Sequence, residues 1–501
     1  AQANAGDYTK EHHYASQAYE LDPDNLKIAT DYALALQHQG RYEEALSLYD
    51  RFITDHPDTT LHFLVNKANL YKSVHKLDLA VEAAQKALSI APNNAEAQVA
   101  LGQINQLMKN YPDSWAALEW NWHIPGRGKF RPTSDIPLWY GDDDLNDKTL
   151  LVFEDQGVGD SLLFMRFLPA VKARYPDCHI QIMAERKMDE IYQRSLSDIC
   201  EVIFKQDSAG RILQADFMCA LSSLPMALGT DIHTLPAPPL LSIRDALNYK
   251  QREDDLIIGL TWKTVNISVG ARRSVELSDF AALATIPGVR LLNLQYGDTK
   301  TEREACDFDM IHDEAINPYE DMQGHLDQIN ACDLVISIDN TTVHAAGTLG
   351  KPVWVLLPYE CYWRAFHHDD EATPWYPSMR LYRQDEGRLF EPVIKRIAQD
   401  LHDVADGKKE RLEPPAPAPL PQPPAPNQKP RALLMNDTSD WYHWGCNATS
   451  TAIKDALRGK GYDVTSAPFL ETGQTTMRPP NLSDFDSRIY FSDYMFTQPT
   501  L

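Results

Sequence analysis

The sequence predicts a multidomain α + α/β protein: an N-terminal α-helical repeat, two doubly wound α/β lobes, and a partial α/β segment at the C-terminal end. Three observations support this. Pro23, Pro57 and Pro92 close similar phrases and are 34 and 35 residues apart. From residue 149, short apolar runs alternate with amphipathic stretches, which is typical of βαβ units. Residues 407–430 form a linker, in which 414–430 contain nine prolines, so that 431–501 stand apart.

Composition excludes several classes of function. The chain has 501 residues, and its 47 Lys+Arg against 71 Asp+Glu give a net charge of −24. Nucleic acids and anionic membranes bind basic surfaces, so neither is expected as a partner. Apolar runs are too short for a membrane span. The seven cysteines are scattered and form no C-x-x-C pair, which indicates reduced core thiols in a cytoplasmic protein rather than disulfides or a zinc site.

The first 122 residues contain a helical repeat. Gly40-Arg-Tyr42 marks a tight turn, and Ala45, Tyr49 and Phe52 follow at the spacing of one helix face. The next copy has His75 in place of the turn glycine. The period resembles that of tetratricopeptide repeats, which implies a scaffold or a docking surface for a protein partner. The alternative is direct recognition of a peptide or glycan acceptor. Residues 123–148 form a connector to the next domain.

Two series of predicted strands form the middle of the chain. The first series, in residues 149–245, starts with the apolar run 149–153, and the second, in 246–406, starts with 256–262. Three prolines in 236–240 break the pattern and indicate a hinge between two Rossmann-like lobes. In doubly wound sheets, ligands bind beyond the carboxyl ends of the strands. Candidate site residues are therefore expected there.

The first candidate motif follows the first strand and opens a helix, ahead of the amphipathic stretch 161–175. Gly157 and Gly159 allow a tight turn and a close approach of a ligand to the backbone. Asp160 lies where it either caps the helix or accepts a proton from an attacking hydroxyl. The motif is not G-x-G-x-x-G, because residue 162 is Leu.

The second candidate motif is basic. Lys263 ends the first strand of the second lobe, and Arg273 and Ser274 follow after a short loop. Such cations beside a strand end suit the diphosphate of a nucleotide leaving group. The alternative is a solvated basic loop.

The third candidate motif is the most specific. A buried strand ends at Asp339, and a helix rich in small residues is expected to start at Thr341. The N–H groups of its first turn form an anion site, to which the hydroxyls of Thr341 and Thr342 add donors. His344 lies one turn into this helix, as a ligand or as a structural residue.

Residues 149–400 resemble GT-B glycosyltransferases related to the lipopolysaccharide heptosyltransferases, glycosyltransferase family 9. The resemblance rests on Gly159-Asp160-Ser-Leu-Leu and on Asp339 five residues before His344, ahead of Gly350-Lys-Pro352. It implies inverting transfer from a nucleotide-sugar donor to a glycan or protein acceptor, with no metal and no further cofactor. By position, Asp160 is the general base, and Lys263, Arg273 and the 339–344 helix start hold the donor phosphates. Thr341 stands where the family commonly has Gly or Ala, and the basic loop does not align cleanly with the family. The resemblance therefore does not predict which sugar and nucleotide form the donor.

Two other functions remain open at this stage. One is a protein O-linked N-acetylglucosamine transferase, which also joins tetratricopeptide repeats to a GT-B core. The other is a non-catalytic scaffold with a degenerate transferase fold. In residues 431–501, strands expected over 431–435, 461–464 and 487–491 and a helix expected over 451–460 read as the start of a further Rossmann-like domain that stops short. His443 with Cys446 reads as a turn with a buried thiol rather than a metal site or nucleophile.

Overall fold

The computed structural model describes residues 2–56, 60–126, 131–132, 134–204, 214–264, 270, 272–360, 371–408, 410, 412 and 414, and the backbone of three strands beyond residue 430. The predicted helix 451–460, Cys361, His443 and Cys446 lie outside this part. The chain divides into two compact units, residues 1–420 and 421–501, which are described separately. Within the described residues, no helix has the length and apolar character needed to span a membrane.

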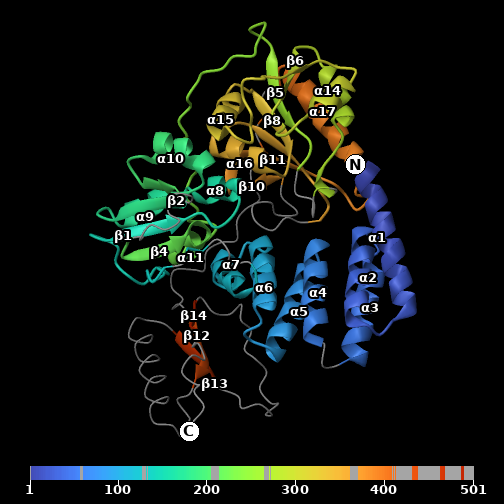
Figure 1. Ribbon diagram of the computed structural model, residues 1–501, viewed down its shortest axis with the longest axis vertical. Coiled ribbons are helices and arrows are strands. Elements are labelled where there is room, and N and C mark those ends of the chain that lie inside the picture. Colours follow the sequence, from blue (N-terminus) through green and yellow to red (C-terminus); the bar gives the residue numbers. More distant parts are fainter. Residues whose placement is uncertain are drawn as a thin grey trace. The chain divides into compact units, whose positions relative to one another are not determined.

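The N-terminal part is a row of paired α-helices (Figure 1). Its helices are α1 (Gln2–Leu21), α2 (Leu26–His38), α3 (Tyr42–Asp55), α4 (Thr60–Ser73), α5 (Leu77–Ile90), α6 (Ala95–Leu107) and α7 (Tyr111–Leu118), followed by the 3₁₀ helix η2 (Glu119–His123). Small residues such as Ala29, Ala33 and Ala45 are fully buried between them, which lets the helices approach closely. The predicted helical repeat is confirmed.

The first lobe has a four-stranded parallel sheet in the order β3-β2-β1-β4. Its strands are β1 (Thr149–Phe153), β2 (His179–Ala184), β3 (Glu201–Phe204) and β4 (Phe217–Ala220), and its helices are α8 (Val158–Phe164), α9 (Phe167–Arg174), α10 (Asp189–Leu196) and α11 (Leu224–Ala227). The amphipathic stretch 161–175 is helical in two pieces, because α8 ends before Met165 and α9 begins at Phe167. Pro169 has no N–H to bond to the preceding turn, so it is tolerated in the first turn of α9 but not inside a continuous helix.

The second lobe has a seven-stranded sheet in the order β10-β11-β9-β8-β5-β6-β7, parallel except between β10 and β11. Its strands are β5 (Leu256–Thr261), β6 (Val289–Asn293), β7 (Met310–Ile311), β8 (Leu334–Ile338), β9 (Val353–Leu357), β10 (Ala372–Thr373) and β11 (Tyr376–Arg383). Its main helices are α13 (Ala281–Ala284), α14 (Lys300–Glu304), α15 (Met322–Asn330), α16 (Thr341–Thr348) and α17 (Glu391–Ala405).

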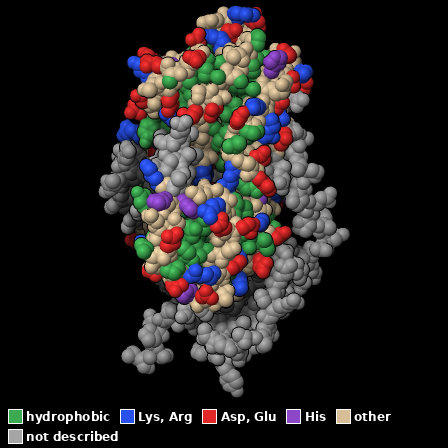
Figure 2. All heavy atoms as spheres, turned by 90° about the vertical axis from the view of Figure 1, so that its right-hand side faces the viewer, with side chains coloured by type: hydrophobic (Ala, Val, Ile, Leu, Met, Phe, Trp, Pro, Cys, Tyr) green, Lys and Arg blue, Asp and Glu red, His purple; other side chains and the backbone are tan. Residues whose placement is uncertain are grey.

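Alternate residues of these strands face two different cores. Ile258, Leu334 and Trp354 face helices α13 and α17, whereas Ile257, Val335 and Val353 face α15 and α16. The second of these cores is continuous with the first lobe and with the end of the repeat, because it also contains Leu150, Leu162, Tyr111, Trp115 and Trp375. The two predicted Rossmann-like lobes of the GT-B type are therefore present and share one core with the repeat. Figure 2 shows a hollow between the second lobe and the repeat, with basic and histidine side chains at its rim.

The C-terminal unit contains a three-stranded parallel sheet. Strand β12 (Arg431–Asp437) lies between β13 (Asp463–Pro468) and β14 (Ser487–Ile489). This confirms the strands predicted after the proline-rich linker. Parallel pairing around a central first strand is the arrangement expected for a partial α/β segment.

Candidate active site

The topology of both sheets marks the same kind of position. In the first lobe, strand order reverses at β1, which has β2 on one side and β4 on the other. In the second lobe it reverses between β5 and β8. Crevices beyond the carboxyl ends of such strands are where doubly wound folds bind ligands. Asp160 follows β1, and Asp339 follows β8, so the predicted motifs lie at the two switch points.

At the first switch point, a short loop turns the chain from β1 into α8. Gly157 is the N-cap of α8, so Asp160 lies in the first turn of the helix and not at the cap. The Asp160 side chain is partly exposed. Glu154, which the sequence analysis did not single out, fixes the strand end: its carboxylate accepts bonds from the Glu185 N–H at 2.7 Å and the Tyr192 hydroxyl at 3.0 Å. Burial raises the pKa of Glu154.

At the second switch point, Asn340 joins two strands to helix α16. Its side-chain oxygen accepts the Thr342 N–H at 2.9 Å and caps the helix, and its amide donates to the Thr261 hydroxyl at 3.0 Å. The Thr261 hydroxyl also bonds to the hydroxyl of Ser337 on β8. Asn340 is not among the predicted site residues, although an Asn directly before a helix is itself an N-cap signal. These bonds fix the start of α16 relative to β5 and β8.

The side chains of α16 that were predicted to bind the donor phosphates differ in their exposure. Thr341 is partly exposed, whereas Thr342 is fully buried and its hydroxyl bonds to Nε2 of His325 on α15 at 3.1 Å. His344 is buried, and its Nδ1 lies 3.2 Å from the Tyr376 hydroxyl. Burial, and then the nearby Arg166 guanidinium, lower the pKa of His344 to about 3. His344 is therefore neutral at pH 7 and adds no positive charge to this helix start.

The basic motif divides between two places. Arg273 Nη1 lies 2.9 Å from Asp339 Oδ2, directly before the α16 start. Lys263 instead forms an ion pair with Glu302 of α14, with 2.6 Å between Nζ and Oε1. The Ser274 hydroxyl accepts the Thr264 N–H at 3.2 Å. Arg273 is thus the predicted cation that the structure brings to Asp339.

The two helix starts touch each other across the lobes. A Cβ placed on Gly159 would lie 3.1 Å from Cδ2 of His344 and 3.5 Å from Cα of Thr341. The Thr348 hydroxyl of α16 donates to the Leu162 carbonyl of α8 at 3.3 Å. Glycine at position 159 therefore permits an approach that a side chain would hinder. As a result, the turn that carries Asp160 lies beside the turn that carries Thr341.

Arg166 reinforces this junction from inside. Its guanidinium is buried and donates to the carbonyls of Leu163, Pro236 and Trp375, the last at 2.8 Å in the second lobe. It also stacks on the rings of Trp375 and Tyr376, at 5.3 and 4.9 Å from their centres. One side chain thereby links the end of α8, the interlobe segment and the second lobe.

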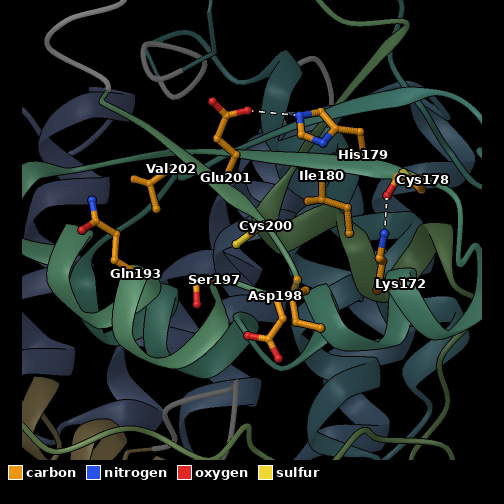
Figure 3. A pocket seen from close by; sticks show the side chains of 11 residues that line it. Lys172, Cys178, His179, Ile180, Gln193, Ser197, Asp198, Cys200, Glu201 and Val202 are labelled. Carbon is orange, nitrogen blue, oxygen red and sulfur yellow. Dashed lines mark hydrogen bonds and ion pairs between the residues drawn. The ribbon is translucent and has the colours of Figure 1, made fainter.

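One cavity of about 380 Å³ lies in the first lobe, away from these motifs. Figure 3 shows its lining, which includes the ion pair of His179 and Glu201 at 3.1 Å and the buried Cys200. His179 and Glu201 start β2 and β3, so this cavity lies at the amino ends of the strands, opposite Asp160. None of the predicted site residues lines it. Within the described part of the chain, His, Cys, Asp and Glu side chains form no group of three arranged to hold a metal ion.

The chain resembles known proteins in two parts. A tetratricopeptide repeat model matches residues 31–59. Protein FlbA of Caulobacter vibrioides is 25% identical over an alignment 447 residues long, and the alignment covers 76% of this chain and 74% of FlbA. A family 9 glycosyl transferase from Veillonella parvula is 13% identical, with a TM-score of 0.40, and the match covers 52% of this chain and 98% of that structure. The ADP-heptose lipopolysaccharide heptosyltransferase II of E. coli is 16% identical, with a TM-score of 0.39, and the match covers 52% of this chain and 99% of that structure.

Proposed function

We propose that this protein is a glycosyltransferase that moves a sugar from a nucleotide-sugar donor to a hydroxyl of a glycan or protein acceptor. The observation that carries this proposal is the contact between the helix starts at Gly159 and Thr341, since each follows a switch-point strand of its own lobe. One start carries Asp160, a partly exposed residue. The other offers backbone N–H groups beside Arg273. A proton acceptor opposite an anion site is what sugar transfer requires.

In the proposed reaction, the acceptor oxygen attacks the anomeric carbon of the donor sugar. The bond from that carbon to the diphosphate oxygen breaks, and the nucleoside diphosphate leaves with the electron pair. Asp160 takes the proton of the acceptor hydroxyl, which is a poor nucleophile near neutral pH. Attack from the face opposite the leaving group inverts the anomeric carbon.

The leaving diphosphate develops negative charge, which the α16 start and Arg273 are suited to stabilise. One well-placed donor to a developing oxyanion lowers the activation free energy by about 2.7–4 kcal/mol. In this proposal the positive charge comes from the Arg273 guanidinium and the helix dipole, because His344 is neutral. Thr341, rather than the buried Thr342, supplies the side-chain hydroxyl. The repeat serves as a platform for the acceptor or for a protein partner.

Asp160→Asn tests the role of the proposed base. The variant keeps the size of the side chain but cannot take the proton, so we expect transfer to fall by about 10²–10⁴-fold. Binding of the donor should remain within about twofold, because the phosphate ligands are unchanged. A panel of UDP-, GDP- and ADP-sugars identifies the donor by calorimetry, and mass spectrometry of candidate glycan and protein acceptors measures transfer. Full turnover by the variant would remove Asp160 from this role, and a wild-type protein that binds no nucleotide-sugar would overturn the proposal.

A further inference from the structure

Residues 359 and 360, which follow β9, contact the helical repeat. The Tyr42 hydroxyl, at the start of α3, donates to Glu360 Oε1 at 3.1 Å. His75, in the turn before α5, bonds through Nε2 to the Tyr359 carbonyl at 2.5 Å. Two consecutive turns of the repeat therefore hold two adjacent residues at the carboxyl edge of the second sheet.

Glu360 is also bound from the side of the lobe. Its second oxygen forms an ion pair with Arg272, and its carboxylate side chain is only 17% exposed. Arg388 approaches Oε1 at 3.6 Å, while its guanidinium lies 4.3 Å from the centre of the Tyr42 ring. A Cβ on Gly40 would lie 2.8 Å from Arg388 Nη1, so the repeat turn is shaped to admit this arginine. The carboxylate thus lies between the repeat and two guanidinium groups.

Arg272 is directly followed by Arg273, which pairs with Asp339 before the α16 start. A continuous chain of contacts therefore runs from Tyr42 through Glu360 and Arg272 to the candidate diphosphate site. Residues that hold an arginine in place reduce the conformational entropy lost when that arginine binds a ligand. Because Glu360 pairs with Arg272 while Asp339 pairs with Arg273, the effect of Tyr42 and Glu360 on the site passes through these two adjacent arginines.

We propose that Glu360, held by Tyr42 of the repeat, is a positioning residue that orients Arg272 and Arg273 for the donor diphosphate. The inference rests on the proposed function of the Arg273 site. This positioning role makes Tyr42 of the repeat a contributor to the donor site, in addition to any role of the repeat as a platform.

Tyr42→Phe tests the proposal by removing one hydroxyl from the full-length protein. The matched control is Tyr19→Phe, because the Tyr19 hydroxyl accepts a bond from Arg51 at 2.6 Å inside the repeat. We expect Tyr42→Phe to weaken binding of UDP, GDP or ADP, whichever the wild type binds, by about five- to tenfold in calorimetry. The control should stay within about twofold, and the two variants should have similar melting temperatures. Glu360→Gln, which loses the ion pair with Arg272, should weaken binding at least as much.

Hydrogen exchange in the absence of nucleotide separates this inference from the proposed function. Exchange of the backbone amides of residues 272–276 should be faster in Tyr42→Phe than in Tyr19→Phe. If exchange is faster in Tyr42→Phe but the wild type binds no nucleoside diphosphate, the structural link from Tyr42 to residues 272–276 stands. The proposed donor site, and with it the role proposed for Glu360, would then be overturned. Equal exchange and equal nucleotide affinity in the two variants would overturn the positioning role and leave the proposed function standing.

Discussion

Two histidines lie buried beside the start of α16, and both are held neutral by their surroundings. His325 is 2% exposed, and burial lowers its pKa to about 4, although its hydrogen bond with Gln328 and the charge of Asp321, the N-cap of α15, oppose this shift. Its Nε2 bonds to the Thr342 hydroxyl, so His325 of α15 holds the first turn of α16 in place. A histidine whose pKa is lowered by folding binds its proton more tightly in the unfolded chain. The folded state therefore loses stability as the pH falls from about 6.5 towards 4.

His325→Gln should reduce this loss. Between pH 7.5 and 5.5, a histidine with unfolded and folded pKa values of 6.5 and about 4 removes about 1.4 kcal/mol of stability. Burial raises the pKa of Glu119 to about 7, so Glu119 stabilises the folded state as the pH falls and opposes the effect of His325. Because this contribution is the same in both proteins, the measurement compares the pH-dependent loss of stability in the variant with that in the wild type. Urea unfolding at both pH values should show a pH-dependent loss about 1.4 kcal/mol smaller in His325→Gln. The exposed His402→Gln is the control, and equal losses in all three proteins would contradict the account.

Among the individual residues, Asp160, Asp339 and Thr341 could be located from the sequence. Each follows a buried apolar run, and the carboxyl ends of such strands are known ligand positions. The neutral state of His344 could not be predicted, since its low pKa comes from burial under residues that are distant in the chain. The pairing of Lys263 with Glu302 was missed for the same reason: a strand end indicates where a cation starts, but not which carboxylate it meets.

Among the elements, the turns of the repeat share one backbone conformation. Gly40, His75 and Lys109 are 35 and 34 residues apart and have φ values of +78°, +62° and +63°. This left-handed region favours glycine, and it costs other residues about 1–2 kcal/mol. At position 75 the ring also bonds to Tyr359, which gives a reason for histidine there. Sequence periodicity predicted the turn, but it could not show that His75 contacts the second lobe.

Lys109→Gly should therefore stabilise the protein, by about 0.5–1 kcal/mol, because glycine adopts this conformation without the steric cost. The control is Lys86→Gly on the exposed face of α5, where the same change should destabilise by about 1 kcal/mol. Thermal unfolding of both variants gives the comparison. A decrease in stability of Lys109→Gly as large as that of the control would show that the turn does not impose this conformation.

For the whole molecule, the repeat and both lobes are joined by buried polar contacts as well as by apolar packing. Trp115 of α7 donates its indole N–H to the Thr230 carbonyl at 2.9 Å, and Trp375 donates to the Tyr111 hydroxyl at 2.8 Å. One helix of the repeat is thus bonded to each lobe. The sequence indicated that the aromatic end of the repeat meets the next domain. It could not reveal that Tyr111 and Trp375 meet, because 264 residues separate them.

This arrangement places the candidate base, the anion site and the repeat around one junction, and a crystal structure with the bound nucleoside diphosphate tests it most directly. We predict diphosphate oxygens about 3 Å from the first N–H groups of α16 and from Arg273, with Asp160 facing the position of the sugar. A diphosphate bound elsewhere, such as in the cavity beside His179 and Glu201, would contradict the account.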